Sequence, residues 1–168
     1  MNQGGDQADM LDGPDRPSLL DLYREGVHEI YADLAADIAQ AGPVCELSGR
    51  CCRFEEYGHR LFLATPEAEL LLRDAPPPVR PLDGGQTCPW QDPLGRCTAR
   101  EARPLGCRVY FCDPTYQDRC YELSEMYISH LKRLSERLGL PWGYAPLHHH
   151  LRRALEEGRA PGLDAPPK

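Results

Sequence analysis

The eight cysteines of this 168-residue chain constrain its fold more than any other feature. They fall between residues 45 and 120, mostly in two stretches without hydrophobic periodicity that are rich in Gly, Pro and charged residues. Thiolates are soft, charged ligands that suit zinc and iron-sulfur clusters, and loops can direct several of them at one centre. The pattern therefore predicts a metal site built from loops. The cysteines are Cys45, Cys51, Cys52, Cys88, Cys97, Cys107, Cys112 and Cys120.

Disulfides and unrelated buried thiols are the two other interpretations of so many cysteines. The N-terminus has no basic start and no apolar segment typical of a secretory signal. No run approaches the roughly 18 apolar residues of a membrane span. We therefore expect a soluble cytoplasmic protein, and the cytoplasm keeps thiols reduced. In that compartment, metal ligation is the leading explanation of the cysteines.

The charge balance limits the classes of partner. The chain has 19 basic and 26 acidic residues, a net charge of −7, which repels phosphate backbones. Neither a nucleic acid nor a membrane is expected as a partner, and the sequence identifies no protein partner. It also lacks a Gly-rich phosphate loop, a nucleophile elbow and an HExxH motif, so it leaves open whether the chain is an enzyme.

The length fits one domain, because domains most often hold roughly 100 to 150 residues. The 17 Pro and 15 Gly indicate many turns. We expect a mainly α fold: a small, helix-rich single domain with little sheet, in which two long helices brace the metal site. The predicted divisions are a disordered leader over residues 1–16, the cysteine-cluster metal-binding domain over residues 17–157, and a flexible tail over residues 158–168.

Local signals predict the individual elements. Ser18 is a typical N-cap, and apolar residues recur at helical spacing over residues 19–38, ending before Gly42. Residues 61–63 favour a short strand, and Thr65 as N-cap followed by Pro66 begins a helix that runs to about residue 74. Further predictions are a local strand over residues 109–111, a helix over residues 121–138 and a short helix over residues 146–157.

Three blocks of the sequence carry a resemblance. The first is Cys45-Glu46-Leu47-Ser48-Gly49-Arg50-Cys51-Cys52, the second is the helix entry at residues 63–67, and the third holds Cys97, Arg103, Pro104, Cys107 and Arg108. Together they resemble the YkgJ-like family, the CxxCxxCC zinc- or iron-chelating domain, over residues 44–121. Ser48 stands at the family's second cysteine, and Arg100 stands where the family usually has tyrosine. The resemblance implies a metal-chelating or iron-sulfur domain; some relatives look like redox proteins, and a similar domain occurs in a flagellin lysine methylase.

The loop pattern and the resemblance together give a set of expected ligands. We expect Cys51, Cys97 and Cys107 to meet at one centre, with Cys45 or Cys52 completing the set. Neighbouring side chains diverge, so Cys51 and Cys52 are expected to face different surroundings. Cys112 is expected outside the first shell, at a buried strand edge. The full set of predicted metal ligands is Cys45, Cys51, Cys52, Cys88, Cys97, Cys107 and Cys120.

Other side chains are weaker candidates. Arg108 either offsets thiolate charge or makes a surface salt bridge. His59 is a candidate nitrogen ligand, whereas the row His148, His149 and His150 is more typical of a solvated helix end. Trp90 is expected in an apolar wall that excludes water from the centre; Tyr110 and Phe111 are expected in the same wall.

The sequence thus predicts a protein that chelates an iron-sulfur cluster or a zinc or iron ion through cysteine thiolates, with redox-linked chemistry as its possible use. The alternative is a structural, zinc-stabilised protein-interaction module without catalysis. A closed tetrahedron of four ligands would favour the structural site, and an open corner would favour the reactive one.

Overall fold

The computed structural model describes residues 17–159, which form six α-helices and one two-stranded sheet. The predicted leader and nearly all of the predicted tail lie outside these residues. The predicted mainly α fold is confirmed, since helices predominate and the sheet is small. None of the described helices is long and apolar enough to cross a membrane.

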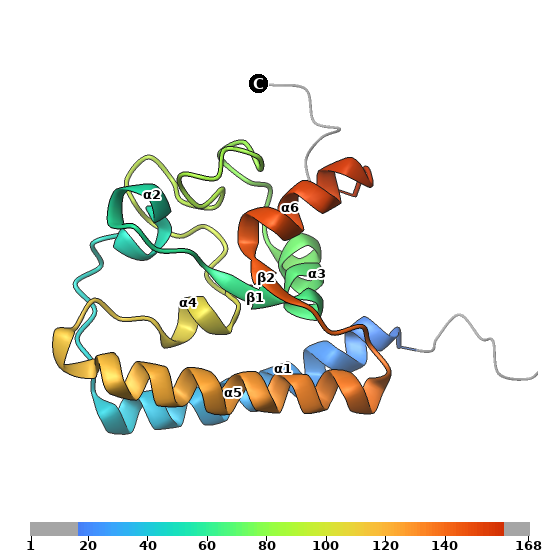
Figure 1. Ribbon diagram of the computed structural model, residues 1–168, viewed down its shortest axis with the longest axis horizontal. Helices are drawn as coiled ribbons and strands as arrows, with labels where there is room; N and C mark the ends of the chain where they lie inside the picture. The colour runs from blue at the N-terminus through green and yellow to red at the C-terminus, as the bar shows by residue number, and fades with distance from the viewer. Residues whose placement is uncertain (1–16, 160–168) are drawn as a thin grey trace, which may run out of the picture.

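Two long helices, α1 (Leu19–Ala41) and α5 (Gln117–Leu138), pack side by side and run in opposite directions (Figure 1). The prediction for α1 is confirmed: Ser18 and Asp21 form a capping box, and Gly42 ends the helix in a left-handed conformation. Helix α5 begins four residues before its predicted start, because the 3-10 turn Pro114–Tyr116 leads into it. Their shared core contains Tyr23, Val27, Leu34, Leu123, Tyr127, Leu131 and Leu134.

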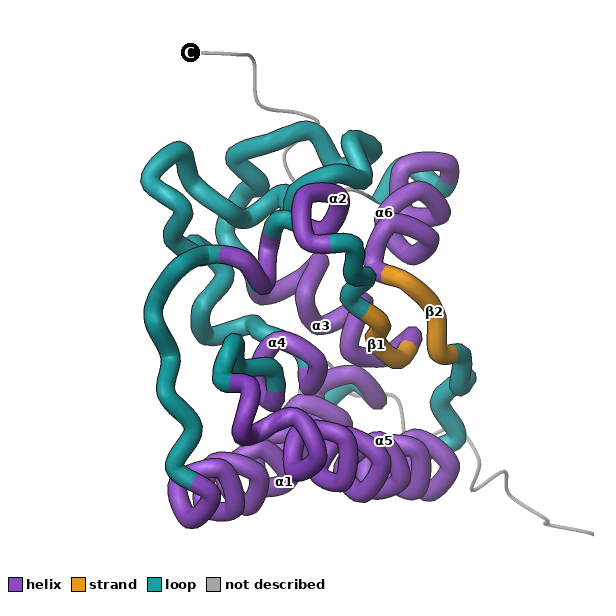
Figure 2. Tube along the Cα trace, turned by 60° about the vertical axis from the view of Figure 1, so that its left-hand side comes forward, coloured by secondary structure: helices purple, strands orange, loops and turns teal. Residues whose placement is uncertain are grey.

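A second core lies on the other side of the molecule (Figure 2). Helix α3 (Thr65–Asp74) packs against α6 (Leu147–Glu156), and both were predicted from the sequence. Strand β1 (Phe62–Ala64) pairs antiparallel with β2 (Tyr144–Pro146) and brings the start of α6 beside α3. Strand β2 was not predicted. The second core also contains Cys52, Cys88 and Trp90.

Apart from Cys120, which lies in α5, the cysteines are carried by loops and short elements. The short elements in this part of the chain are the 3-10 turn Arg50–Cys52, helix α2 (Phe54–Tyr57), and helix α4 (Leu105–Val109). The predicted strand over residues 109–111 is wrong, because the chain forms α4 up to Val109 and continues without a β partner. Pro104 starts this short helix and Leu105 and Val109 are buried one turn apart, so the apolar run has the helical period.

Candidate metal centre

Cys51 and Cys52 lie in a 3-10 turn that Gly49 makes possible. Gly49 has a φ of 68°, in the left-handed region, and a Cβ at this position would meet Gln91 Nε2 and the Gly95 carbonyl oxygen, both at 2.6 Å. Gln91 Nε2 donates to the Gly49 carbonyl at 2.9 Å. The glycine of the first cysteine block therefore lets two cysteine loops approach each other closely.

Backbone hydrogen bonds hold Cys88 and Cys97 against the first loop. The Cys88 N–H donates to the Cys52 carbonyl at 2.7 Å. Cys97 forms an antiparallel bridge with Gln91, and the Thr98 N–H donates to the Trp90 carbonyl at 2.8 Å. Main-chain contacts thus place Cys88 and Cys97 beside the first cysteine loop.

Cys107 is supplied by α4, which the buried carboxylate of Glu67 holds in place. Glu67 Oε1 accepts from the Leu105 N–H at 2.7 Å, at the start of α4. Gly106 allows α4 to lie close to β1, because a Cβ there would stand 2.7 Å from Leu61 Cδ1. These contacts direct Cys107 toward the two loops.

Five of the predicted ligands meet at one small cavity of about 40 Å³. Leu71, Trp90 and Ala99 form apolar parts of its wall, and Trp90 is only 1% exposed. We call this space the inner cavity. Its cysteines are Cys51, Cys52, Cys88, Cys97 and Cys107.

The adjacent cysteines Cys51 and Cys52 face each other, with their sulfurs 3.8 Å apart. The expectation that they would diverge is wrong, because the tight 3-10 turn brings the two side chains to the same side. In a tetrahedral site with Zn–S bonds of about 2.3 Å, neighbouring sulfurs stand about 3.8 Å apart. The observed separation therefore matches one edge of such a site.

The thiols oppose one another's ionisation. The hydrogen bond to Cys52 is the main cause that raises the pKa of Cys51. The same bond lowers the pKa of Cys52, but the Cys88 thiol and burial outweigh it and raise that pKa to about 12. Burial raises the pKa of Cys107 far above its usual range, and the charges of Cys52, Cys97 and Cys51 add to this effect. A cation among the sulfurs would relieve this repulsion.

Arg103, and not Arg108, is the guanidinium that faces the thiols. Burial lowers the pKa of Arg103, but its bond to Cys97 and the neighbouring thiolate charges raise it overall. Arg108 instead donates to the carbonyls of Arg103 and Glu101 at 2.7 and 2.8 Å. Its guanidinium lies 4.4 Å from the centre of the Tyr31 ring. The main contacts of Arg108 are thus with two backbone carbonyls and an aromatic ring. They are neither contacts with the thiols nor a surface salt bridge, the two roles expected from the sequence.

A larger cavity of about 480 Å³ opens beside the inner one. Four cysteines line both spaces, namely Cys51, Cys52, Cys97 and Cys107. A small molecule in this outer cavity can therefore reach these four thiols. Cys45 and Cys112 line the outer cavity only. The residues that complete its wall include Arg96, Arg100, Arg103, Arg108, Tyr110 and Phe111.

Cys45, Cys112 and Cys120 stand apart from the inner group. The Cys112 sulfur lies 3.7 Å from Ser48 Oγ, so it faces the position at which the family pattern has a cysteine. Cys45 is exposed. Cys120 packs against the core of the long helices, and burial raises its pKa although it lies in the first turn of α5.

The histidines do not form a group. His59 Nε2 lies 3.2 Å from the Cys51 carbonyl oxygen, and its ring stacks on Tyr110. His150 is buried, with Nε2 3.0 Å from the Leu63 carbonyl oxygen, which differs from the expected solvated helix end. His149 is exposed.

Among residues 17–159, no three or more His, Cys, Asp or Glu side chains already stand in a geometry that holds a metal ion. The five inner thiols nevertheless share one cavity and are donors of the type that zinc and iron prefer. All eight cysteines are free thiols, and rotation about one bond, χ1, moves each sulfur. No family model, curated protein or solved structure matches the chain, and the family resemblance stays a prediction.

Proposed function

We propose that this protein binds a thiophilic metal through Cys51, Cys52, Cys97 and Cys107. The observation that supports the proposal is that these four thiols, from two loops and one helix, line the same inner cavity. The charges of the other three thiols all act on Cys107. Cys88 lines the same cavity and its thiol interacts with that of Cys52, so it is the supporting fifth thiol.

The size of the inner cavity favours a single ion. Its volume of about 40 Å³ is small, and five sulfurs share it. Zinc and iron are the ions that four thiolates suit best. An iron-sulfur cluster has several atoms and needs more space than one ion, so it is the second candidate for the bound group.

The surrounding residues define what the centre can do. Four thiolates and one divalent ion carry a net charge of −2, and Arg103 offsets part of it. Trp90, Leu71 and Ala99 keep water from the inner side. On the other side, the outer cavity gives a small reactant access to the thiols, as redox-linked chemistry requires. We place this chemistry in the cytoplasm, where thiols stay reduced.

A structural zinc site is the alternative function, and one observation favours it. Residues 75–104 contain no helix or strand and only the isolated bridge between Gln91 and Cys97. A metal that joins Cys52 and Cys97 to Cys107 would link this loop region to α4. Such a cross-link stabilises a domain without any reaction.

Metal analysis of the protein purified without oxygen tests the proposal. We expect about one zinc or iron per chain, with no absorption bands of an iron-sulfur cluster. The variants Cys97→Ala and Cys107→Ala should lose the metal. Cys112→Ala is the matched control, because this thiol lies outside the inner cavity, and it should keep the metal.

Two results would contradict the single-centre proposal: equal metal loss in all three variants, or two independent ions per chain. Reactivity then separates the two functions. If the centre is reactive, small thiol reagents or oxidants that enter the outer cavity release the metal quickly. A metal that resists them in the folded protein would favour the structural site.

A further inference from the structure

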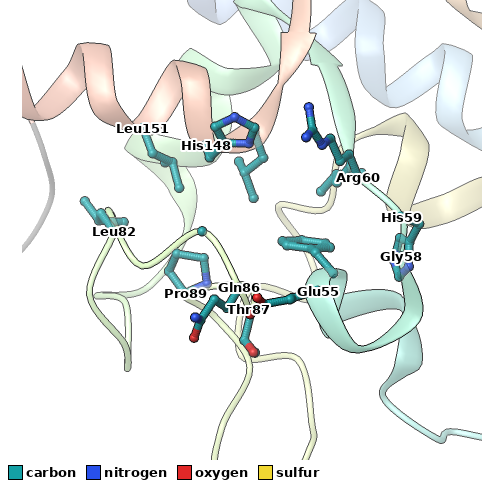
Figure 3. Close-up of a pocket in the computed structure, with 14 residues that line it drawn as sticks. Glu55, Gly58, His59, Arg60, Leu82, Gln86, Thr87, Pro89, His148 and Leu151 are labelled. Carbon is teal, nitrogen blue, oxygen red and sulfur yellow. The ribbon is translucent and has the colours of Figure 1, made fainter.

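A separate cavity of about 450 Å³ lies between α2, the loop over residues 82–89 and the start of α6 (Figure 3). It contains none of the eight cysteines. Its volume lies within the range of about 300 to 1,000 Å³ that is typical of small-molecule sites. The cavity therefore has the size of a ligand site, and none of the proposed metal ligands lines it.

Main-chain hydrogen bonds connect the segments that form the walls of this cavity. The Glu55 N–H donates to the Gln86 carbonyl at 3.1 Å and joins α2 to the loop. The Leu147 N–H donates to the Leu61 carbonyl at 2.8 Å and joins α6 to the segment before β1. These bonds fix neighbouring parts of the wall relative to each other.

Apolar side chains make up the floor. Leu82, Leu147 and Leu151 are almost fully buried members of the second core, and Phe54 and Leu61 pack against that core. Together with Pro89, these five side chains form the apolar part of the lining. An apolar ring or branched chain would gain the most from contact with this surface.

The polar groups lie on two opposite edges (Figure 3). Arg60 and His148 share one edge, whereas Glu55, Gln86 and Thr87 lie across the cavity. Within residues 17–159, no carboxylate stands within ion-pair distance of Arg60. The Arg60 guanidinium is thus available to a carboxylate on a ligand.

His148 adds a neutral donor to this edge. Burial is the main cause that lowers the pKa of His148, and the charge of Arg60 lowers it further. At neutral pH the imidazole therefore carries one N–H, which can donate to an oxygen beside Arg60. Across the cavity, the Glu55 carboxylate repels a second negative charge.

We propose that this cavity binds a small monocarboxylate with an apolar ring or branched body. The carboxylate pairs with Arg60 and accepts from His148. The apolar body lies on Phe54, Leu82 and Leu151. A dicarboxylate is disfavoured because its second charge would face Glu55.

The test uses phenylacetate as the probe and follows the backbone amide signals of the isotope-labelled, metal-loaded protein by NMR. We expect saturable shifts at the amides of residues 54–60, 82–87 and 147–151. Phenylacetamide, which keeps the ring without the charge, and acetate, which keeps the charge without the ring, should each bind at least about tenfold more weakly.

Two variants and a control locate the site. Arg60→Gln should weaken phenylacetate binding by about tenfold or more. Gln86→Trp places a large side chain in the opening and should abolish binding while the amide spectrum of the long helices is retained. Arg133→Gln removes an exposed arginine of α5, away from the cavity, and should leave the affinity unchanged.

Three outcomes would overturn the proposal. The first is no saturable binding of phenylacetate up to about 10 mM. The second is equal affinity for phenylacetate and phenylacetamide, and the third is an equal effect of Arg60→Gln and Arg133→Gln. All measurements use the metal-loaded protein, so that the loop over residues 82–89 keeps its place, and none of the proposed metal ligands lines the cavity.

Discussion

Glu67 Oε1 accepts a hydrogen bond from the backbone N–H of Leu105 at 2.7 Å, across 38 residues of sequence. Leu105 begins α4, the helix that carries Cys107. The same carboxylate accepts from the Tyr31 hydroxyl of α1 and, through Oε2, from the Ala64 N–H at 2.9 Å. One buried side chain therefore joins α1, β1 and α3 to the helix of the proposed centre.

We predict that Glu67→Ala lowers the free energy of unfolding by about 3 kcal/mol, because it leaves several buried donors without an acceptor. Glu67→Gln should cost less, about 1 kcal/mol, since its amide oxygen can still accept from Leu105. Urea unfolding checks both values. Glu125→Gln on the exposed face of α5 is the control and should stay within about 0.5 kcal/mol of the parent. A similar small effect of Glu67→Ala would contradict the role of this carboxylate.

Metal removal should destabilise the cysteine-bearing half far more than the long helices. A thiolate site can contribute on the order of 10 kcal/mol, and residues 75–104 have little regular structure to replace it. Hydrogen exchange before and after chelation measures the effect by segment. We expect lost protection over residues 84–98 and 105–109, with more protection kept at Leu123 and Leu131 of α5. Unchanged exchange and unchanged thermal unfolding after complete chelation would argue against a bound metal.

Gly106→Ala should weaken both the fold and metal retention. A Cβ at this position meets Leu61 Cδ1 at 2.7 Å and the Phe62 carbonyl oxygen at 3.1 Å. The overpacking cost of about 1–3 kcal/mol equals or exceeds the gain of about 1 kcal/mol in helix propensity. The net loss of stability, measured by urea unfolding, is therefore at most about 2 kcal/mol.

The double variant with Leu61→Ala tests the cause of this loss. Removal of the Leu61 side chain relieves the nearer contact, so Gly106→Ala should cost less in that background than in the parent. An equal cost in the two backgrounds would place the strain elsewhere. Metal content, measured on the same samples, should follow the order of stability.

His150 should make stability depend on pH near neutrality. Burial is the main cause that lowers its pKa in the folded chain. Protonation then favours the unfolded chain, so this contribution to stability is complete above the unfolded pKa of about 6.5 and is lost as the pH falls below it.

The variant His150→Gln isolates this contribution. Its amide can still donate to the Leu63 carbonyl, which His150 Nε2 contacts at 3.0 Å, but it does not titrate. Urea unfolding at a series of pH values from about 8 to about 5 should show a smaller difference between parent and variant at the acidic end. A constant difference over this range would contradict the assignment.

The local sequence determined the helices that have a repeated apolar period or recognisable capping residues. Helix α1 has an apolar stripe of helical period between Ser18 and Gly42, and each of its ends is fixed by residues of that same segment. The period also revealed α5, although its first turn depends on the bend at Pro114. The predicted strand at residues 109–111 was wrong because a single five-residue helix is too short to repeat its period.

The sequence also restricted the candidate ligands to cysteines in loops, because ligand chemistry depends on residue type. Tertiary structure decided which of them meet. Cys88, Cys97 and Cys107 reach Cys52 only after hydrogen bonds between distant segments fix the loops, whereas Cys45 and Cys120 lie outside the inner cavity.

The most important residue that the sequence did not identify as part of the site is Glu67. As the third residue of α3, Glu67 is an acidic residue of the kind that often begins a helix. Its hydrogen bond from the Ala64 N–H agrees with that local role. Its bond to Leu105 has no local signal, because the free energy of a buried hydrogen bond depends on a partner that only packing brings into reach. Sequence patterns record the period and the caps of a segment, whereas the position of α4 against α3 results from the packing of two cores whose residues lie far apart along the chain.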